Sequence, residues 1–230
     1  MVPAMPADSG AGATPFVPAR GADLATLRRA VQSCQGCDLF ERATQAVFGT
    51  GPAPAPLMLI GEQPGDAEDR QGKPFVGPAG RVLDRALSEA GIPPDQFYVT
   101  NAVKHFRWRD DPRGSKRRLH QRPDVTQVRA CMPWLSAEIE RVNPRLLVTL
   151  GATAGQAIFG SSFRVGEQRG HQVRWLPPQP RDPGHDPTDV IVVVTIHPSA
   201  VLRADDRDAA YTGFVNDLRE AARALSQATG

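Results

Sequence analysis

Four short apolar stretches, each ending at a small, polar or turn-forming residue, form the clearest pattern in the chain. They span residues 57–60, 97–103, 146–150 and 190–196. Short apolar stretches bounded in this way are typical of buried β-strands. Helical spacing of apolar residues occurs between or after them, at Arg81 to Ala90, Asp124 to Val142, Ala152 to Phe159 and about Arg207 to Ala224. Pro133 is expected to kink the second of these helices or to mark its true start.

Strands that alternate with helices predict a parallel sheet covered on both faces. We therefore expect an α/β fold with three α/β/α layers and a central, mainly parallel, four-stranded sheet. The alternation breaks between Arg164 and Thr188 into a predicted hairpin, His171 to Leu176, and a Pro-rich loop, Pro177 to Pro187. We expect this segment to be an excursion from the sheet, because it is too short for a domain.

The 230 residues, 40% of them hydrophobic, are enough for one sizeable core. Residues 1–20, rich in Pro, Ala and Gly, predict a flexible tail, and 21–230 predict a single domain. No apolar run approaches the ~20 residues that cross a bilayer, and the N-terminus lacks the pattern of a signal peptide. An odd number of cysteines, three, makes a poor disulfide framework. We expect a cytoplasmic monomer without membrane contact.

The ends of the four predicted strands carry the candidate chemistry, because ligands of open α/β sheets bind beyond the carboxyl ends of the strands. Glu62 lies in the turn Gly61 to Asp66, where a carboxylate can stabilise positive charge or orient an imidazole. A plain loop is the alternative. The turn contains neither a Walker motif nor GxGxxG, so nucleotide-phosphate binding is not indicated. Gly151-Ala152-Thr153 follows the third strand.

Two rings next to prolines are further candidates. Phe75 lies between Pro74 and a glycine-containing turn ahead of a helix, where it is suited to stack on a flat base. His197 precedes Pro198 directly after the last strand, so its imidazole is held where it can donate to charge on a leaving group. Core burial of Phe75 and a structural role for His197 are the alternatives.

Positive charge is concentrated in one segment. Lys104 to Arg122 contains eight Lys or Arg and two Asp, a balance of +6, whereas the whole chain carries +2. The segment includes Lys116-Arg117-Arg118-Leu119-His120. Charge gathered in this way indicates a surface that faces a polyanion. A solvated, mobile loop is the alternative.

Cys34-Gln35-Gly36-Cys37 has the spacing of a metal site. A thioredoxin-like redox pair is not expected, since no strand of a βαβ unit precedes it. The candidate partners are Cys131, the only other cysteine, and His105, at the end of a predicted strand. This set suits either zinc or an iron–sulfur cubane. Unrelated buried thiols are the remaining alternative.

Five motifs in order resemble the iron–sulfur, family 4 uracil-DNA glycosylases, and specifically their UdgX branch, from about Ala22 to the last helix. They are GEQPGD at Gly61, GKPFVGPAG at Gly72, TNAVKHF at Thr100, KRRLH at Lys116 and HPSAVLR at His197. Gln63 stands where ordinary family 4 members usually carry Ala, and the KRRLH insertion is typical of UdgX. His105 stands where ordinary members have a third cysteine.

The resemblance implies a structural [4Fe–4S] cluster held by Cys34, Cys37, His105 and Cys131. It implies that Phe75 stacks on a flipped-out uracil and that Asn101 reads N3 and O4 of the base. His197 would stabilise departing uracil through O2, and Glu62 would support the sugar cation. The expected substrate-binding set is completed by Gln63, Gly65 and Asp66, and the expected DNA-binding set is Lys116, Arg117, Arg118 and Ser199.

In UdgX-like proteins the histidine of KRRLH captures C1′ of the sugar, which implies that His120 forms a covalent DNA adduct. An oxocarbenium-like sugar can be trapped by any close nucleophile. We expect the three basic residues before His120 to hold phosphates and to disfavour its protonation. The expected partner is uracil-containing DNA, with single strands favoured. An ordinary turnover glycosylase and a noncatalytic, zinc-stabilised DNA-binding module are the alternatives.

Overall fold

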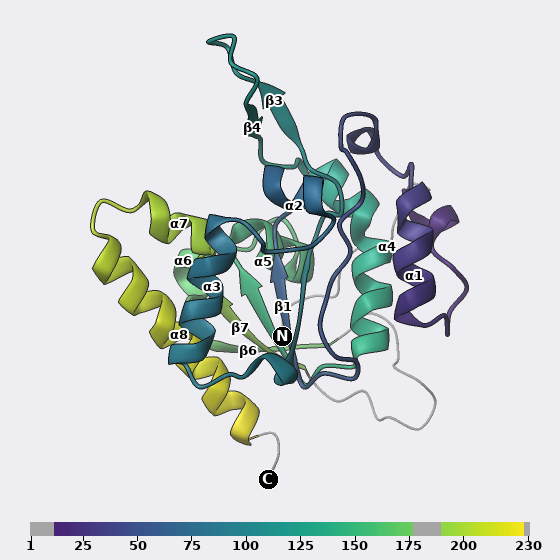
Figure 1. Cartoon of the computed structure of the whole chain (residues 1–230). Coiled ribbons are helices and arrows are strands. Elements are labelled where there is room, and N and C mark those ends of the chain that lie inside the picture. Colours follow the sequence, from purple (N-terminus) through teal and green to yellow (C-terminus); the bar gives the residue numbers. More distant parts are fainter. Residues whose placement is uncertain (1–11, 177–189, 228–230) are drawn as a thin grey trace.

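The computed structural model describes residues 12–176 and 190–227 and contains a five-stranded sheet in the order β2-β1-β5-β7-β6 (Figure 1). Four strands are parallel: β1 (Leu57–Gly61), β2 (Phe97–Asn101), β5 (Leu146–Leu150) and β7 (Val190–Thr195). The predicted mainly parallel α/β sheet is confirmed, with five strands in place of four. The Pro-rich loop predicted at 177–187 lies outside the described residues.

The fifth strand corrects the prediction for residues 171–176. Strand β6 (Gln172–Trp175) belongs to the main sheet, where it pairs antiparallel with β7 along Val190 to Val193. Trp175 is buried, whereas Gln172 and Arg174 are exposed. An edge strand with only one buried face carries a weak apolar signal. For this reason the sequence pattern predicted an excursion from the sheet at these residues.

Helices cover both faces of the sheet (Figure 1). On one face, α3 (Pro78–Glu89) and α8 (Arg207–Gln227) pack against Leu57 and Leu59 of β1. On the other, α4 (Val125–Val142) and α5 (Ala152–Phe159) pack against Met58 and Ile60. The remaining helices and 3-10 turns are α1 (Leu24–Ala30), α2 (Asp66–Gln71), α6 (Val165–Gln168), α7 (Pro198–Arg203), Thr14–Phe16, Val31–Ser33, Asp38–Glu41 and Pro94–Gln96. None of the helices in the described ranges is long and apolar enough to cross a membrane.

Helix α4 begins well before Pro133. Asp124 caps it by accepting the N–H of Gln127, and the Gln127 side chain accepts the N–H of Asp124 in return. This capping box fixes the start at Val125, so Pro133 lies inside the helix and does not mark its start.

Residues 12–20, predicted as the end of a flexible tail, contact α4. Ala13 is buried, and its N–H donates to the carbonyl oxygen of Ala130 at 2.8 Å. Gly36 approaches so closely that a Cβ there would lie 2.6 Å from the Ala13 backbone. Residues 1–11 of the predicted tail lie outside the described part of the chain.

A fully buried ion pair joins the end of β2 to α4. The Lys104 ammonium contacts the Glu138 carboxylate, and neither side chain is exposed. Glu138 also accepts the hydroxyls of Tyr98 and Thr100 and the N–H of Gly49. Lys104 donates in addition to the carbonyl oxygen of Asn101, at 2.7 Å. The network therefore fixes the strand end where the candidate site begins.

Replacing Glu138 with Gln tests this network. The variant leaves the buried Lys104 ammonium without its counter-charge, so we expect the free energy of unfolding to fall by about 3–5 kcal/mol. Chemical denaturation measures the loss. Glu140→Gln is the matched control on the same helix, because Glu140 pairs with arginines nearer the surface and should cost at most about 1 kcal/mol. Equal losses in both variants would contradict a central role for the pair.

Candidate functional site

Gly61, Asn101 and Phe75 meet at the carboxyl ends of β1 and β2. Gly61 and Asn101 are paired in register across the two strands. A Cβ on Gly61 would lie 2.3 Å from Asn101 Oδ1 and 2.6 Å from Phe75 Cζ. Only a residue without a side chain allows the amide and the ring to approach one another here.

Asn101 presents a buried acceptor without a donor. The side chain is only 2% exposed, and its Oδ1 has no hydrogen-bond partner among the described residues. An unsatisfied buried oxygen costs about 1–3 kcal/mol, so such an atom is suited to a ligand that brings an N–H group.

Phe75 is held beside this amide by its backbone. Its φ of 56° lies in the left-handed region, and a Cβ on Gly80 would lie 1.7 Å from its carbonyl oxygen. Glu68 of α2 ties this loop to the turn after β1 by accepting the N–H groups of Gly65, at 3.0 Å, and Gly77, at 2.7 Å. The Phe75 ring faces the His197 ring with centroids 6.2 Å apart.

His197 caps α7 and presents one defined tautomer. Its Nδ1 accepts the N–H of Ser199 at 3.1 Å, so the neutral ring carries its proton on Nε2. Burial lowers the pKa of His197 to about 4, and the charges of His120, when it is protonated, and of Arg203 act in the same direction. At neutral pH the side chain is therefore an uncharged donor. Ser199, expected at the DNA, also contacts His197 Nδ1 with its hydroxyl and accepts from Arg203.

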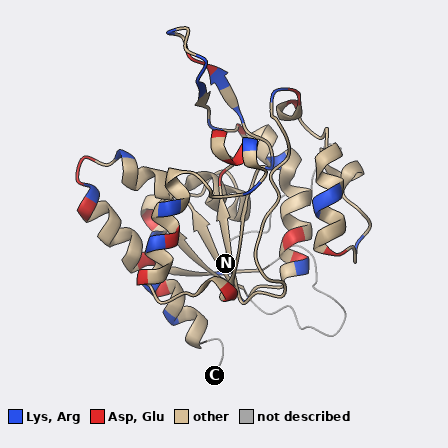
Figure 2. Cartoon of the chain, viewed as in Figure 1, with Lys and Arg blue, Asp and Glu red and all other residues tan. Residues whose placement is uncertain are grey.

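The basic segment forms a β-hairpin that projects from the domain (Figure 1). Its strands are β3 (Trp108–Asp110) and β4 (Arg118–His120). The turn between them is closed by Asp111, which accepts the Ser115 hydroxyl and the Arg113 N–H. Figure 2 shows basic residues along both strands and towards the tip. Lys116 and Arg117 are exposed there, as a polyanion-binding surface requires.

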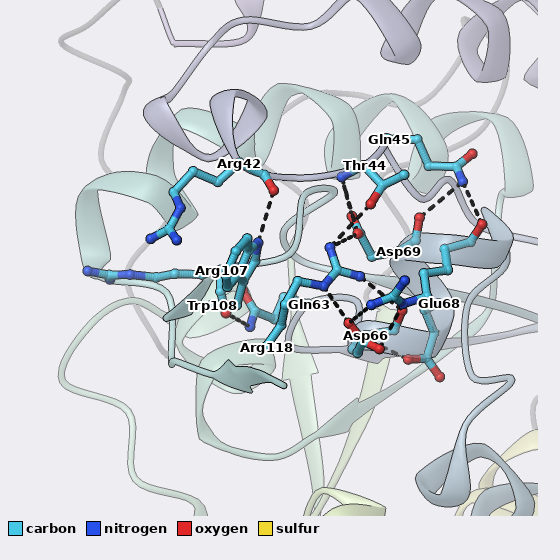
Figure 3. Close-up of polar contacts among 12 residues, drawn as sticks. Arg42, Thr44, Gln45, Gln63, Asp66, Glu68, Asp69, Arg107, Trp108 and Arg118 are labelled. Carbon is cyan, nitrogen blue, oxygen red and sulfur yellow. Dashed lines mark hydrogen bonds and ion pairs between the residues drawn. The ribbon is translucent and has the colours of Figure 1, made fainter. Parts of the chain in front are cut away.

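Arg118 attaches the hairpin to α2 (Figure 3). Its guanidinium donates to Asp69 at 2.7 Å and also pairs with Asp66. It lies 5.4 Å from the ring centroids of Phe106 and Trp108, and the side chain is 12% exposed. The sequence predicted that Arg118 contacts phosphates and that Asp66 contacts the substrate. In the structure Arg118 and Asp66 form an ion pair with one another. Arg118 therefore holds the hairpin against α2.

Gln63 clamps the base of the same hairpin (Figure 3). Its Oε1 accepts the N–H of Arg107 at 3.0 Å, and its Nε2 donates to the carbonyl oxygens of Arg107 and Gln121, each at 3.1 Å. The same Nε2 lies 2.9 Å from His120 Nε2. The amide nitrogen has two hydrogens for these three groups, and when it donates one of them to His120, the neutral imidazole ring accepts with Nε2 and carries its proton on Nδ1.

His120 is half-exposed beside Glu62, with Nε2 3.5 Å from Glu62 Oε1. Partial burial lowers the pKa of His120, Arg203 lowers it further, and the Glu62 charge opposes them. The pKa of His120 is thus lowered, as expected. The causes are burial and Arg203, and not the basic residues that precede His120 in the sequence. Glu62 also accepts the Thr153 hydroxyl, and Arg122 lies 3.8 Å away. Thr153, Arg122 and Arg203 were not predicted as site residues.

The three cysteines gather in one small core, and none forms a disulfide. Trp134 donates its indole N–H to Cys34 Sγ at 3.2 Å, and the Lys104 N–H donates to Cys131 Sγ at 3.3 Å. His105 follows Lys104 and is buried, and burial lowers its pKa to about 4. Within the described ranges, no three His, Cys, Asp or Glu side chains form a group that could hold a metal ion. Sulfurs that accept N–H bonds nevertheless fit the thiolate ligands of a larger cluster.

Comparison with known proteins gives one family. Residues 48–219 match the model of the uracil DNA glycosylase superfamily. The chain is 33% identical over 184 residues to a type-4 uracil-DNA glycosylase of Sulfurisphaera tokodaii, covering 78% of this chain and 76% of the relative. Similar proteins with that name occur in Pyrobaculum aerophilum (33% identical; 79% and 85% covered) and Thermotoga maritima (33% identical; 75% and 80% covered).

The lowered pKa of His197 predicts a pH-dependent contribution to stability. Its pKa is about 4 when folded against 6.5 when unfolded, so the contribution is complete above about pH 6.5 and is lost as the pH falls towards 4. We expect the unfolding free energy of the native protein to fall in this interval by about 3 kcal/mol more than that of His197→Asn. Denaturant titrations across the interval measure the difference. His171→Asn, at an exposed site, should parallel the native protein, and parallel curves for His197→Asn would contradict the assignment.

Proposed function

Because the chain belongs to the uracil-DNA glycosylase superfamily, we propose that it recognises uracil in DNA, excises it and stays attached to the sugar through His120. The observation that carries this proposal is Asn101 Oδ1, which has no hydrogen-bond partner in the described part of the chain. N3 of uracil bears a hydrogen and can donate to that oxygen, whereas N3 of cytosine bears none. Phe75, beside the amide, offers a face on which the extruded base can stack.

His197 is suited to assist departure of the base. When the bond between C1′ and N1 breaks, its electron pair leaves with uracil, and negative charge develops on the O2 and O4 oxygens. A neutral imidazole with its proton on Nε2 can donate that hydrogen to O2. Donors fixed where charge develops typically contribute several kcal/mol to catalysis.

The sugar cation then meets Glu62 and His120. The lone pair on His120 Nε2 forms the new bond to C1′, and the imidazole gains a positive charge. Glu62 Oε1, 3.5 Å from Nε2, is suited to offset both the sugar cation and this charge. The lowered pKa of His120 favours the neutral, nucleophilic ring.

For DNA binding we propose Lys116 and Arg117, two exposed basic residues in the turn before β4, as phosphate contacts, with Ser199 next to the crevice. Arg118 is reassigned to positioning, because two carboxylates already neutralise it. Single strands should be favoured because extrusion of an unpaired base costs less.

We propose that Cys34, Cys37, Cys131 and His105 hold a [4Fe–4S] cluster. When bound, the cluster supplies a cross-link between segments far apart in the sequence. Support comes from the common core of the three thiols and from the N–H groups that donate to Cys34 and Cys131.

Denaturing electrophoresis with a uracil-containing single strand tests the reaction. The native protein should give an adduct that survives SDS and heat, and His120→Ser should lose the adduct while releasing some abasic product. Asn101→Ala should be impaired in excision by about 10- to 100-fold. His171→Ser, at an exposed site, should behave as the native protein.

Three outcomes distinguish the alternatives. An abasic product without an adduct would identify a turnover glycosylase, and binding without excision would identify a noncatalytic module. An adduct in His120→Ser would show that another residue is the nucleophile.

The cluster proposal is tested by iron content. We expect Cys131→Ala to lose iron and its brown colour, while His105→Cys should retain both, because a thiolate replaces an imidazole at the same corner. An unchanged iron content in Cys131→Ala would contradict the assignment of Cys131 as a ligand. A colourless protein with stoichiometric zinc would favour the zinc alternative.

A further inference from the structure

Thr153 contacts the Glu62 carboxylate from the neighbouring strand end. Thr153 is the second residue of α5, directly after β5, and Glu62 follows β1, the parallel partner of β5. The Thr153 side chain is buried, and its hydroxyl contacts Glu62 Oε2. Arg122 Nε lies 3.0 Å from the same hydroxyl oxygen.

The direction of these hydrogen bonds follows from the chemistry of the groups. The arginine Nε–H can only donate, so the Thr153 oxygen accepts from Arg122. The single hydroxyl hydrogen is then left for Glu62, whose Oε2 must accept it. This arrangement leaves Glu62 Oε1 as the oxygen that faces His120 Nε2.

Arg122 is itself held in place for this contact. Its Nη2 donates to Gln156 Oε1 on α5 at 2.9 Å, and it follows His120 by two residues. The hairpin that carries His120 is thereby connected to the helix that carries Thr153. One arginine couples the position of the imidazole to the orientation of the carboxylate.

We propose that Thr153 is a positioning residue for the reaction: its hydroxyl, oriented by Arg122, fixes the Glu62 carboxylate so that Oε1 faces the sugar and His120. Thr153 touches neither substrate nor nucleophile and acts only through Glu62. The inference rests on the proposed function, since Glu62 needs an orientation only if it supports the sugar cation.

Thr153→Val removes the hydroxyl with little change of shape, and Thr153→Ser retains it. Thr149→Val is the matched control: Thr149 is equally buried, on β5, and its hydroxyl has no hydrogen-bond partner among the described residues. The measurement is the single-turnover rate of uracil excision and adduct formation at saturating DNA, together with the affinity for the same strand lacking uracil.

We expect Thr153→Val to lower the excision rate by about 10- to 100-fold, the worth of one hydrogen bond to a charged group, with unchanged DNA affinity. The excision rate of Thr153→Ser should lie within about threefold of the native rate. The rate of Thr149→Val should equal the native rate. The proposal is overturned if Thr153→Val excises at the native rate, or if Ser and Val are equally impaired, which would assign the effect to packing of the methyl group. A native protein that never excises uracil would refute the proposed function instead, a result distinct from either of these.

Discussion

The buried pair of Lys104 and Glu138 is the contact on which the site depends most. Two charges removed from water are tolerated only if each compensates the other. Here the compensation also joins three segments: the end of β2, helix α4 and the residues around Gly49. The ammonium holds the backbone of Asn101, and the backbone N–H of Lys104 donates to Cys131. The Asn101 backbone and the thiol core therefore share one support.

Both side chains that we assign to charge stabilisation are held in the same way. Arg122 donates to Thr153, which donates to Glu62, and Arg203 donates to Ser199, which contacts His197. In each case an arginine, which can only donate, orients a hydroxyl, and the hydroxyl contacts the carboxylate or the imidazole. Dipoles fixed before the reaction need not reorganise during it, which is the condition for effective electrostatic catalysis.

The sequence predicted most of the sheet and brought together several residues of the candidate site, for identifiable reasons. The predicted bounds are correct for Leu146–Leu150 and Ala152–Phe159, because a glycine ends each of these strong apolar patterns. Strand β6 and the hairpin strands are short and half-polar, so β6 was predicted as part of a separate hairpin and β3 and β4 were not predicted. The strand ends pointed to Glu62, Asn101 and His197, since topology places such ends together. The sequence assigned no role to Gly151 to Thr153.

The partners of these residues could not be predicted in the same way. Arg118 meets Asp69 at a sequence separation of 49 positions, and Lys104 meets Glu138 at a separation of 34. Pairs of this kind depend on the packed fold and leave no local pattern. The roles of Gln63 and Arg118 in holding the hairpin became apparent only from their three-dimensional contacts.

The ion pairs of the basic segment change how its charge should be counted. Lys104, Arg107 and Arg118 pair with carboxylates of the protein, and Arg122 lies near Glu62. Arg109, Arg113, Lys116 and Arg117, on β3 and in the turn, are the exposed remainder. Each phosphate of a single strand that is neutralised by a protein cation releases roughly 0.7 counterion. The ionic-strength dependence of DNA association should therefore reflect this outer set, and much of the segment's formal charge is spent on holding the fold together.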